Sequence, residues 1–194
     1  MALILRARER VAVPWKNGGG VTRTVAVHPA GSDLESFDWR VSIAEVRSSG
    51  PFSIFSGVER HMAVLRGRLS LSIDGGAALI LTADSAPLSF AGDVPAHGVA
   101  LAGAVTDLNV MSRRGRCSAQ LRHWPAAAAA PSTPHAAAAL VLALGPLTVL
   151  TAAGELQLEE LDAAWLPEGT RGVRLSAPGG AGCYLAHFQG EGAR

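Results

Sequence analysis

The chain is poor in cysteine, lysine and net charge, and each shortage argues against a class of protein. Its 194 residues include two cysteines and one lysine, and the formal net charge is +1. Cys117 and Cys183 lie far apart and match neither a disulfide framework nor a zinc-ligand spacing, which favours a reducing compartment. A nearly neutral chain also lacks the basic face with which proteins neutralise nucleic-acid phosphates. We therefore expect no nucleic-acid partner.

Long hydrophobic runs are missing as well. The apolar run at the N-terminus has five residues, too few for the core of a signal peptide. The longest later run, 136–144, has nine residues, whereas a membrane-spanning helix needs roughly 20. These lengths predict a cytoplasmic protein without a membrane partner.

Lysine and asparagine are scarce in a chain that is rich in alanine, glycine, arginine and proline. There is one lysine and there are two asparagines. Such a composition is typical of a GC-rich genome, whose codons disfavour both residues. Lys16, Asn17 and Asn109 then mark positions where arginine, serine or glycine cannot replace them. The alternative is that these residues remain by chance, since the counts are small.

Strand patterns dominate the chain, and no amphipathic helix is predicted before residue 124. In 68–74, leucine and isoleucine alternate with polar residues, which is the period of a half-buried strand. The sequence "DGG" at 74–76 predicts a hairpin turn, and Gly67 predicts a bulge or bend. Further strands are expected at 21–27, 37–46, 61–74, 78–83, 105–112, 140–144, 147–151, 155–161, 163–167, 171–176 and 182–188.

An alanine- and proline-rich segment separates two strand-rich blocks. Three prolines between 125 and 139 exclude one continuous helix there, so the segment is interpreted as a linker. Many short strands without helices between them are typical of β-sandwiches and barrels. The sequence therefore predicts an all-β protein with two barrel-like halves, 1–124 and a smaller 140–194, joined by the linker 125–139.

Three consecutive glycines follow Lys16 and Asn17 in "WKNGGGVTR". A phosphate-binding loop would need a helix directly after the glycines, and here a strand is expected instead. A flexible connection between two strands is the plain interpretation, since glycine tolerates positive φ. The functional alternative is a loop whose backbone comes close to a ligand, with Lys16 and Asn17 as donors.

Polar side chains recur on one face of two predicted strands. Alternation puts Arg40 and Ser42 on one face of 37–46. In the strand 105–112, Asp107 and Asn109 share a face with Met111, and Arg113 is in phase if the strand continues. Aspartate and asparagine are poor strand formers, so a polar pocket is one reason for their presence, and a solvated face is the other.

Catalytic patterns are weak throughout the chain. His61 stands just before an apolar strand, with Glu59 nearby. Two interpretations are open: a structural histidine or a metal ligand. Neither a nucleophile elbow nor a zinc-protease motif occurs. A cofactor-free enzyme would have to use His61 or Asp107 as general acid or base, with Glu45 and Glu59 as further candidates.

Four ordered segments together resemble the HutD/Ves family. They are "WKNGGGVTR", "FDWRVSIAEVRSSGPFSIFSGVERHMAVLRG", "FAGD" and "VTDLNVMSRRG", and the resemblance covers roughly 3–124. It implies a bicupin, with two cupin-type β-barrel or jelly-roll halves in one chain. For the HutD branch it implies a protein associated with histidine utilisation that holds N-formylglutamate or formiminoglutamate. For the Ves branch it implies a link to cold response without an assigned reaction.

The cupin comparison also argues against a metal. The first cupin metal motif ends in a glutamate seven residues before a glycine, and counting back from Gly67 gives Arg60. No histidine lies in 53–56, where the motif's histidines would fall. Arginine in place of the carboxylate would turn a cation site into an anion site, because its planar fork suits a carboxylate. The alternative is that Arg60 is a surface residue near a turn.

The resulting hypothesis is that the protein is a cupin without metal or cofactor. We expect it to bind a small carboxylate ligand and not to be an enzyme. Arg60 would pair with one carboxylate and Lys16 or Arg40 with the other, while amide and hydroxyl groups recognise the rest of the ligand. A homodimer is plausible by analogy with cupins. The enzyme and a purely structural β-protein stay open as alternatives. The candidate ligand-binding residues are Lys16, Asn17, Arg40, Ser42, Arg60, His61, Asp107, Asn109 and Arg113.

Overall fold

The computed structural model of the chain describes residues 1–125 and 138–190. These residues form two compact units. The first, called here the N-terminal unit, is Val11–Ser118, and the second, the C-terminal unit, joins Met1–Arg10 to Ala119–Gly190. Within the described residues the only helix is a short 3-10 turn, η1 (Ala7–Glu9), and no helix is long and apolar enough to cross a membrane.

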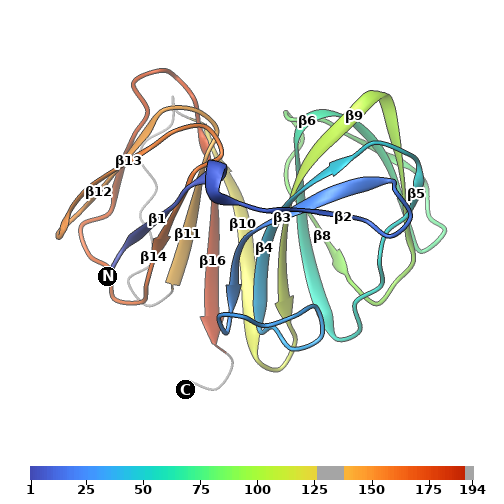
Figure 1. Cartoon of the computed structure of the whole chain (residues 1–194), viewed down its shortest axis with the longest axis horizontal. Helices are drawn as coiled ribbons and strands as arrows, with labels where there is room; N and C mark the ends of the chain where they lie inside the picture. The colour runs from blue at the N-terminus through green and yellow to red at the C-terminus, as the bar shows by residue number, and fades with distance from the viewer. Residues whose placement is uncertain (126–137, 191–194) are drawn as a thin grey trace. The chain divides into compact units, whose positions relative to one another are not determined.

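One large antiparallel sheet makes up the N-terminal unit (Figure 1). Its strand order is β2-β3-β4-β9-β6-β7, with β5 paired to β9 and β8 paired to β6. The sheet therefore ends in two edge strands, β2 and β7, and is not closed through that path. The strands are β2 (Ala12–Pro14), β3 (Gly20–His28), β4 (Trp39–Val46), β5 (Gly50–Pro51), β6 (Val58–Ile73), β7 (Leu79–Leu81), β8 (Leu88–Ala91) and β9 (Ala96–Arg113).

The two longest strands, β6 and β9, pair along almost their whole length. Their register shifts on both sides of Arg66, next to Gly67 with its φ of 87°. A side chain at Gly67 would meet the carbonyl of Ala104 at 2.8 Å, so the bend needs glycine. The predicted bulge at Gly67 is confirmed, and so is the hairpin at 74–76, where β6 turns into β7.

Two sheets make up the C-terminal unit, one with the order β1-β14-β11-β16-β10 and one with the order β13-β12-β15. Apolar side chains fill its core, among them Val141, Leu147, Val149 and Leu185. The strands are β1 (Leu3–Leu5), β10 (Cys117–Trp124), β11 (Ala138–Ala143), β12 (Leu147–Thr151), β13 (Gly154–Leu158), β14 (Ala163–Leu166), β15 (Arg174–Ser176) and β16 (Cys183–Gly190).

The boundaries of the two units differ from those of the predicted halves, 1–124 and 140–194. Both the start and the end of the first half differ. β1 pairs with β14, so the first ten residues belong to the C-terminal unit. β10 joins the sheet of β16, so the boundary falls at residue 118 rather than 124. Most of the predicted linker lies outside the described residues, and Ala138 and Ala139, its last two residues, belong to β11.

The inner face of the N-terminal unit changes character along β9. Val105 belongs to an apolar cluster with Met62, Val64 and Leu69. Two and four residues later on the same face stand Asp107 and Asn109, both buried. One part of β9 is therefore apolar on this face, and the next part carries buried polar groups. This second part of the strand is where the candidate site lies.

Candidate functional site

Strand register brings the predicted polar residues into adjacent positions on one face. Ser42 of β4 is opposite Asn109 of β9, and Ala44 is opposite Asp107. Met111 is paired with Arg40 on one side and with Arg60 of β6 on the other. Since side chains alternate across a strand, these residues all face the same side of the sheet.

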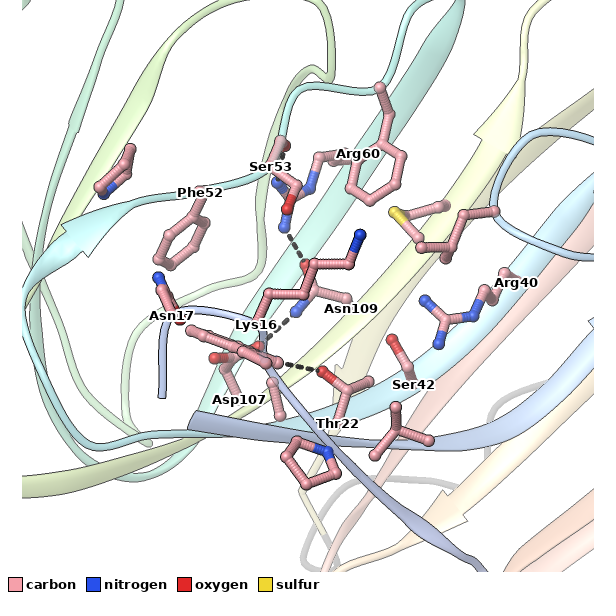
Figure 2. A pocket seen from close by; sticks show the side chains of 18 residues that line it. Lys16, Asn17, Thr22, Arg40, Ser42, Phe52, Ser53, Arg60, Asp107 and Asn109 are labelled. Carbon is pink, nitrogen blue, oxygen red and sulfur yellow. Dashed lines mark hydrogen bonds between the residues drawn. The ribbon is translucent and has the colours of Figure 1, made fainter. Parts of the chain in front are cut away.

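This face forms one wall of a cavity of about 680 Å³ in the N-terminal unit (Figure 2). The rest of its lining is mainly apolar and includes Trp15, Leu34, Phe52, Phe55 and Met111. Seven of the nine predicted residues line the cavity: Lys16, Asn17, Arg40, Ser42, Arg60, Asp107 and Asn109.

A chain of hydrogen bonds joins Arg60, Asn109 and Asp107. Nη2 of Arg60 donates to Oδ1 of Asn109 at 2.6 Å, and Nδ2 of Asn109 donates to Oδ1 of Asp107. The exposed fractions of the three residues are 6%, 6% and 1%. A buried cation and a buried carboxylate are thus connected through one neutral amide that bonds to both, while Nε of Arg60 has no hydrogen-bond partner among the described residues.

Aromatic rings enclose the Arg60 guanidinium. Its Cζ lies 5.4 Å from the ring centre of Phe52, 5.8 Å from that of Phe55 and 5.1 Å from that of Phe90. Such contacts stabilise a cation that has been removed from water. Burial lowers the pKa of Arg60 to about 10, and Asp107 opposes the shift, so the side chain stays charged at neutral pH.

Asp107 is the carboxylate of the cavity. Burial raises the pKa of Asp107 to about 7, although Arg60 and the hydrogen bond from Asn109 act in the opposite direction. A carboxyl group that titrates near neutrality in a cavity wall is able to accept or release a proton, or to bind a donor on a ligand.

Arg40 is held by β4 and uses little of its hydrogen-bonding capacity. Its Nη2 donates to Oγ1 of Thr24 at 2.9 Å. Among the residues that the structure describes, no carboxylate forms an ion pair with Arg40. Burial lowers the pKa of Arg40 from its ordinary value. A partly buried guanidinium facing a cavity without a carboxylate partner is suited to an anion.

The glycine loop folds against the protein. Oδ1 of Asn17 accepts from the amide of Gly19 at 3.0 Å, and Gly18 has a φ of 71°. A side chain at Gly20 would clash with the carbonyl of Glu45 and lie 3.2 Å from the Trp15 ring. Gly18 therefore serves the turn and Gly20 its packing on β4, and β3 begins at Gly20, as the connection interpretation predicts. Lys16 and Asn17 remain exposed at the cavity.

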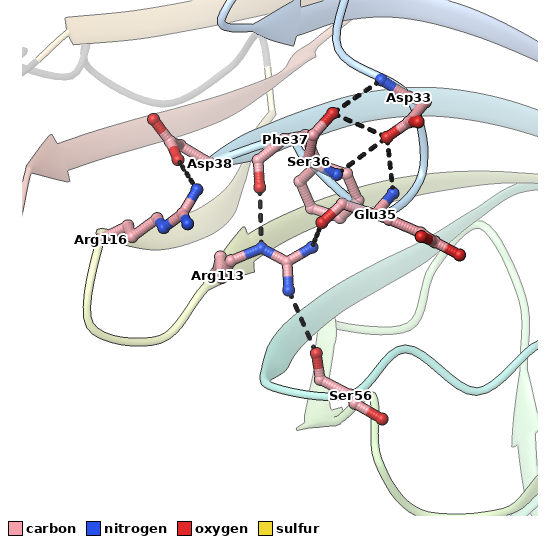
Figure 3. Close-up of polar contacts among 8 residues, drawn as sticks. All are labelled: Asp33, Glu35, Ser36, Phe37, Asp38, Ser56, Arg113 and Arg116. Atoms are coloured by element: carbon pink, nitrogen blue, oxygen red, sulfur yellow. Dashed lines mark hydrogen bonds and ion pairs between the residues drawn. The ribbon is translucent and has the colours of Figure 1, made fainter.

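Two predicted residues, His61 and Arg113, do not line the cavity. His61 follows Arg60 on β6 and so faces the opposite side, where its Nδ1 is hydrogen-bonded to Oγ of Ser89 at 2.7 Å. Arg113 ends β9, and its guanidinium contacts carbonyl groups of two loops (Figure 3). The alternation of the strand was a sufficient signal against His61, since Arg60 and His61 are neighbours.

Sequence reasoning missed the aromatic part of the site. Phe52 and Phe55 lie on the connection before β6, and Phe90 lies on β8, which pairs with β6 opposite Arg60. Trp15 donates from Nε1 to Oγ1 of Thr22 at 2.7 Å, and it lines the cavity. Only the β6–β8 pairing, which is not a local pattern, brings Phe90 to Arg60.

Metal ligands are not gathered in the part of the chain that the structure describes. No group of three or more histidine, cysteine, aspartate or glutamate side chains there could hold a metal ion. Arg60 lines the cavity. A metal-free site remains a prediction, to be tested by metal analysis of the purified protein.

Comparison with known sequences finds one family along most of the chain. The HutD family profile matches residues 7–185. An "Uncharacterized 21.2 kDa protein in hutC 3'region" from Pseudomonas putida is 37% identical over 120 residues, which are 61% of this chain and 62% of that protein. Protein Ves from Cronobacter sakazakii is 37% identical over 109 residues, 56% of this chain and 59% of that protein. The alignments thus span less than two thirds of these curated relatives.

Solved structures match over nearly the full length. A conserved protein of unknown function from Pseudomonas aeruginosa PAO1 has a TM-score of 0.87 and 31% identity, covering 97% of this chain and 99% of that chain. HutD from Pseudomonas fluorescens SBW25 has a TM-score of 0.84 and 28% identity, covering 99% and 100%. A cupin 2 conserved barrel domain protein from Leptotrichia buccalis has a TM-score of 0.54 and 10% identity over 92% of each chain. That last likeness concerns the fold alone, and it confirms the predicted all-β, cupin-type architecture.

Proposed function

This chain belongs to the HutD family, and we propose that its N-terminal unit binds a small dicarboxylate of histidine degradation, N-formylglutamate or formiminoglutamate. Binding would moderate histidine utilisation by sequestering or sensing the intermediate. The observation that carries the proposal is Arg40, a partly buried guanidinium in the cavity wall without a carboxylate partner among the described residues.

The charge of the cavity supports a ligand with two carboxylates. Lys16, Arg40 and Arg60 line the cavity with one acidic side chain, Asp107. Three cations against one carboxylate leave an excess of positive charge, which a dianion neutralises. An electrostatic match of this kind favours specific association over binding of neutral or cationic metabolites.

The two arginines have different parts in this proposal. Arg60 is already bonded to Asn109 and enclosed by phenylalanines, so it holds the amide and contributes positive potential. Arg40 and the exposed Lys16 are less engaged and take the two carboxylates. Asn17, Ser42 and Asn109 recognise the formyl or formimino group, and Asp107 accepts a hydrogen bond from the formimino nitrogen.

A cofactor-free enzyme is the second candidate, and Asp107 is the observation that favours it. A buried carboxyl group with a pKa of about 7 meets the requirement for a general acid or base at neutral pH. The other candidates for this role, His61, Glu45 and Glu59, do not line the cavity.

A thermal-shift panel tests both functions. The protein is melted with N-formylglutamate, formiminoglutamate, urocanate, glutamate and succinate, and then incubated with each for product analysis. A ligand at about 100 times its dissociation constant adds roughly 2.7 kcal/mol of stability. Stabilisation by a formyl or formimino compound without turnover supports the binding function, turnover supports the enzyme, and a panel without any shift contradicts the proposed ligand class.

The remaining expectations are part of the same proposal. We place the protein in the cytoplasm and expect it to be a homodimer. In each chain, we expect both halves to be of the cupin type. Light scattering of the purified protein measures its mass in solution, and a monomer would contradict the dimer. Histidine-utilisation genes beside this gene would favour the HutD role over a Ves-like stress role.

A further inference from the structure

Arg113 uses its guanidinium to join two loops (Figure 3). Its Nε donates to the carbonyl of Phe37 at 3.0 Å, and its Nη2 donates to the carbonyl of Glu35 at 2.7 Å. Its Nη1 donates to the carbonyl of Ser56 at 3.3 Å. The first two acceptors belong to the β3–β4 loop, 29–38, and the third belongs to the β5–β6 loop, 52–57.

Both loops supply walls of the cavity. The β3–β4 loop contributes Leu34, and the β5–β6 loop contributes Phe52, Ser53 and Phe55. Leu34 and Ser53 are exposed, so these residues form the outer part of the lining. Arg113 itself lies two residues beyond Met111, which lines the cavity from β9.

The β3–β4 loop is a preformed turn that Arg113 anchors. Oδ1 of Asp33 accepts from the amides of Glu35 and Ser36 at 3.0 and 2.9 Å, which closes the turn carrying Leu34. At its end Phe37 is fully buried, and the Arg113 Cζ lies 5.1 Å from the centre of its ring. Movement of this turn therefore requires the contacts of Arg113 to break.

The geometry of these contacts requires arginine. The three acceptors are carbonyl oxygens that the planar fork reaches through Nε and both Nη atoms. Among the described residues no carboxylate forms an ion pair with Arg113. A lysine ammonium retains the positive charge but not the fork, so it cannot hold both loops in the same way.

We propose that Arg113 is a positioning residue that couples the β3–β4 and β5–β6 loops and thereby controls ligand exchange through the outer part of the cavity. The coupling of the loops stands on the contacts alone, whereas the effect on a ligand rests on the proposed function. The two parts therefore need separate measurements.

Hydrogen exchange tests the coupling without any ligand. The amides of Ser36 and Asp38 report on the first loop, and those of Phe55 and Gly57 report on the second, since all four are hydrogen-bonded. In Arg113→Ala we expect exchange in both loops to accelerate about tenfold, while the amides of β4 stay protected. Free guanidinium, at concentrations too low to unfold the protein, should restore part of the protection.

Arg116→Ala is the matched control, because Arg116 forms an ion pair of 3.1 Å with Asp38 of the first loop, and among the described residues no hydrogen bond or ion pair joins it to the second loop. It should accelerate exchange in that loop at most. Arg113→Lys keeps the charge and serves if the alanine variant is unstable, and it should loosen both loops as well. Unchanged exchange in either loop of a folded Arg113 variant would overturn the proposed coupling.

Stopped-flow binding of N-formylglutamate, followed by tryptophan fluorescence, to which Trp15 in the cavity wall contributes, tests the effect on exchange. We expect both the association and the dissociation rate constants of Arg113→Lys to rise about tenfold, with a smaller change in their ratio. Rate constants equal to those of the wild type, or a change in only one of the two, would overturn the control of exchange. If the wild type does not bind N-formylglutamate, the proposed function fails, and hydrogen exchange still decides the coupling.

Discussion

The amide oxygen of Asn109 accepts a hydrogen bond of 2.6 Å from Nη2 of Arg60, and this bond fixes the orientation of the amide. Its nitrogen is thereby turned toward Asp107, to which it donates. An aspartate at position 109 could not donate in this way in its ionised form, and serine would be too short to span both partners. The bond accounts for an asparagine in the middle of a strand, where it is otherwise a poor choice.

Replacing Asn109 with leucine tests this arrangement. The two side chains have the same branching and the same number of non-hydrogen atoms, but the variant leaves Arg60 and Asp107 buried without the amide between them. We expect Asn109→Leu to lower the free energy of unfolding by about 3 kcal/mol, measured by urea denaturation. The chain's other asparagine provides the control, since Asn17 is exposed and accepts one bond from Gly19. Asn17→Ala should cost about 1 kcal/mol, and equal losses in the two variants would contradict the account.

Asp107 makes the stability of the protein fall as the pH rises. Its pKa is about 7 in the folded protein and near 4 in an unfolded chain, so between these values the folded state holds a proton that the unfolded state has released. The stabilising contribution of the protonated carboxyl is therefore complete below about pH 4 and is lost progressively up to about pH 7. The maximum slope is about 1.4 kcal/mol per pH unit.

Asp107→Asn removes this titration. Denaturation curves of the wild type and the variant, taken between pH 5 and pH 8, should show the stability of the wild type falling relative to that of the variant. The comparison cancels the other titrating groups, which both proteins share. A constant difference across this range would mean that the Asp107 pKa is not raised.

Gly20 should tolerate no side chain. A methyl group there would meet the Glu45 carbonyl and the Trp15 ring, both fixed by the packing of the loop on β4. We expect Gly20→Ala to destabilise the protein by about 2 kcal/mol, measured by chemical denaturation. Gly50→Ala is the control, because a methyl group at Gly50 would meet no atom within 4 Å and no positive φ is required there. A tolerated Gly20→Ala would contradict the packing described for the loop.

The polar face was predictable because it depends on local rules. Alternation put Arg40 with Ser42 and Asp107 with Asn109, and strand pairing then brought the two faces together. The resemblance to cupins pointed to Arg60. Each of these inferences needed only neighbouring residues or an ordered motif.

Contacts between distant segments could not be predicted from local patterns in the sequence. Phe90 reaches Arg60 only through the β6–β8 pairing, and the loop anchored by Arg113 brings Leu34 to the cavity. β1 lies in the C-terminal unit because it pairs with β14, about 160 residues later. Arg113 was in phase with Asn109, but the strand ends there, and its side chain finds carbonyl acceptors in two loops instead.

Isothermal titration of N-formylglutamate into the wild type and Arg40→Gln tests the central claim most directly. The account predicts saturable binding to the wild type with one site per chain, and at least about tenfold weaker binding to Arg40→Gln, because a partly buried ligand carboxylate loses a charged partner. Arg68→Gln is the control, since Arg68 is exposed and does not line the cavity, and it should bind as the wild type does. Equal affinities for the wild type and Arg40→Gln, or no heat of binding with the wild type, would contradict the proposed anion site.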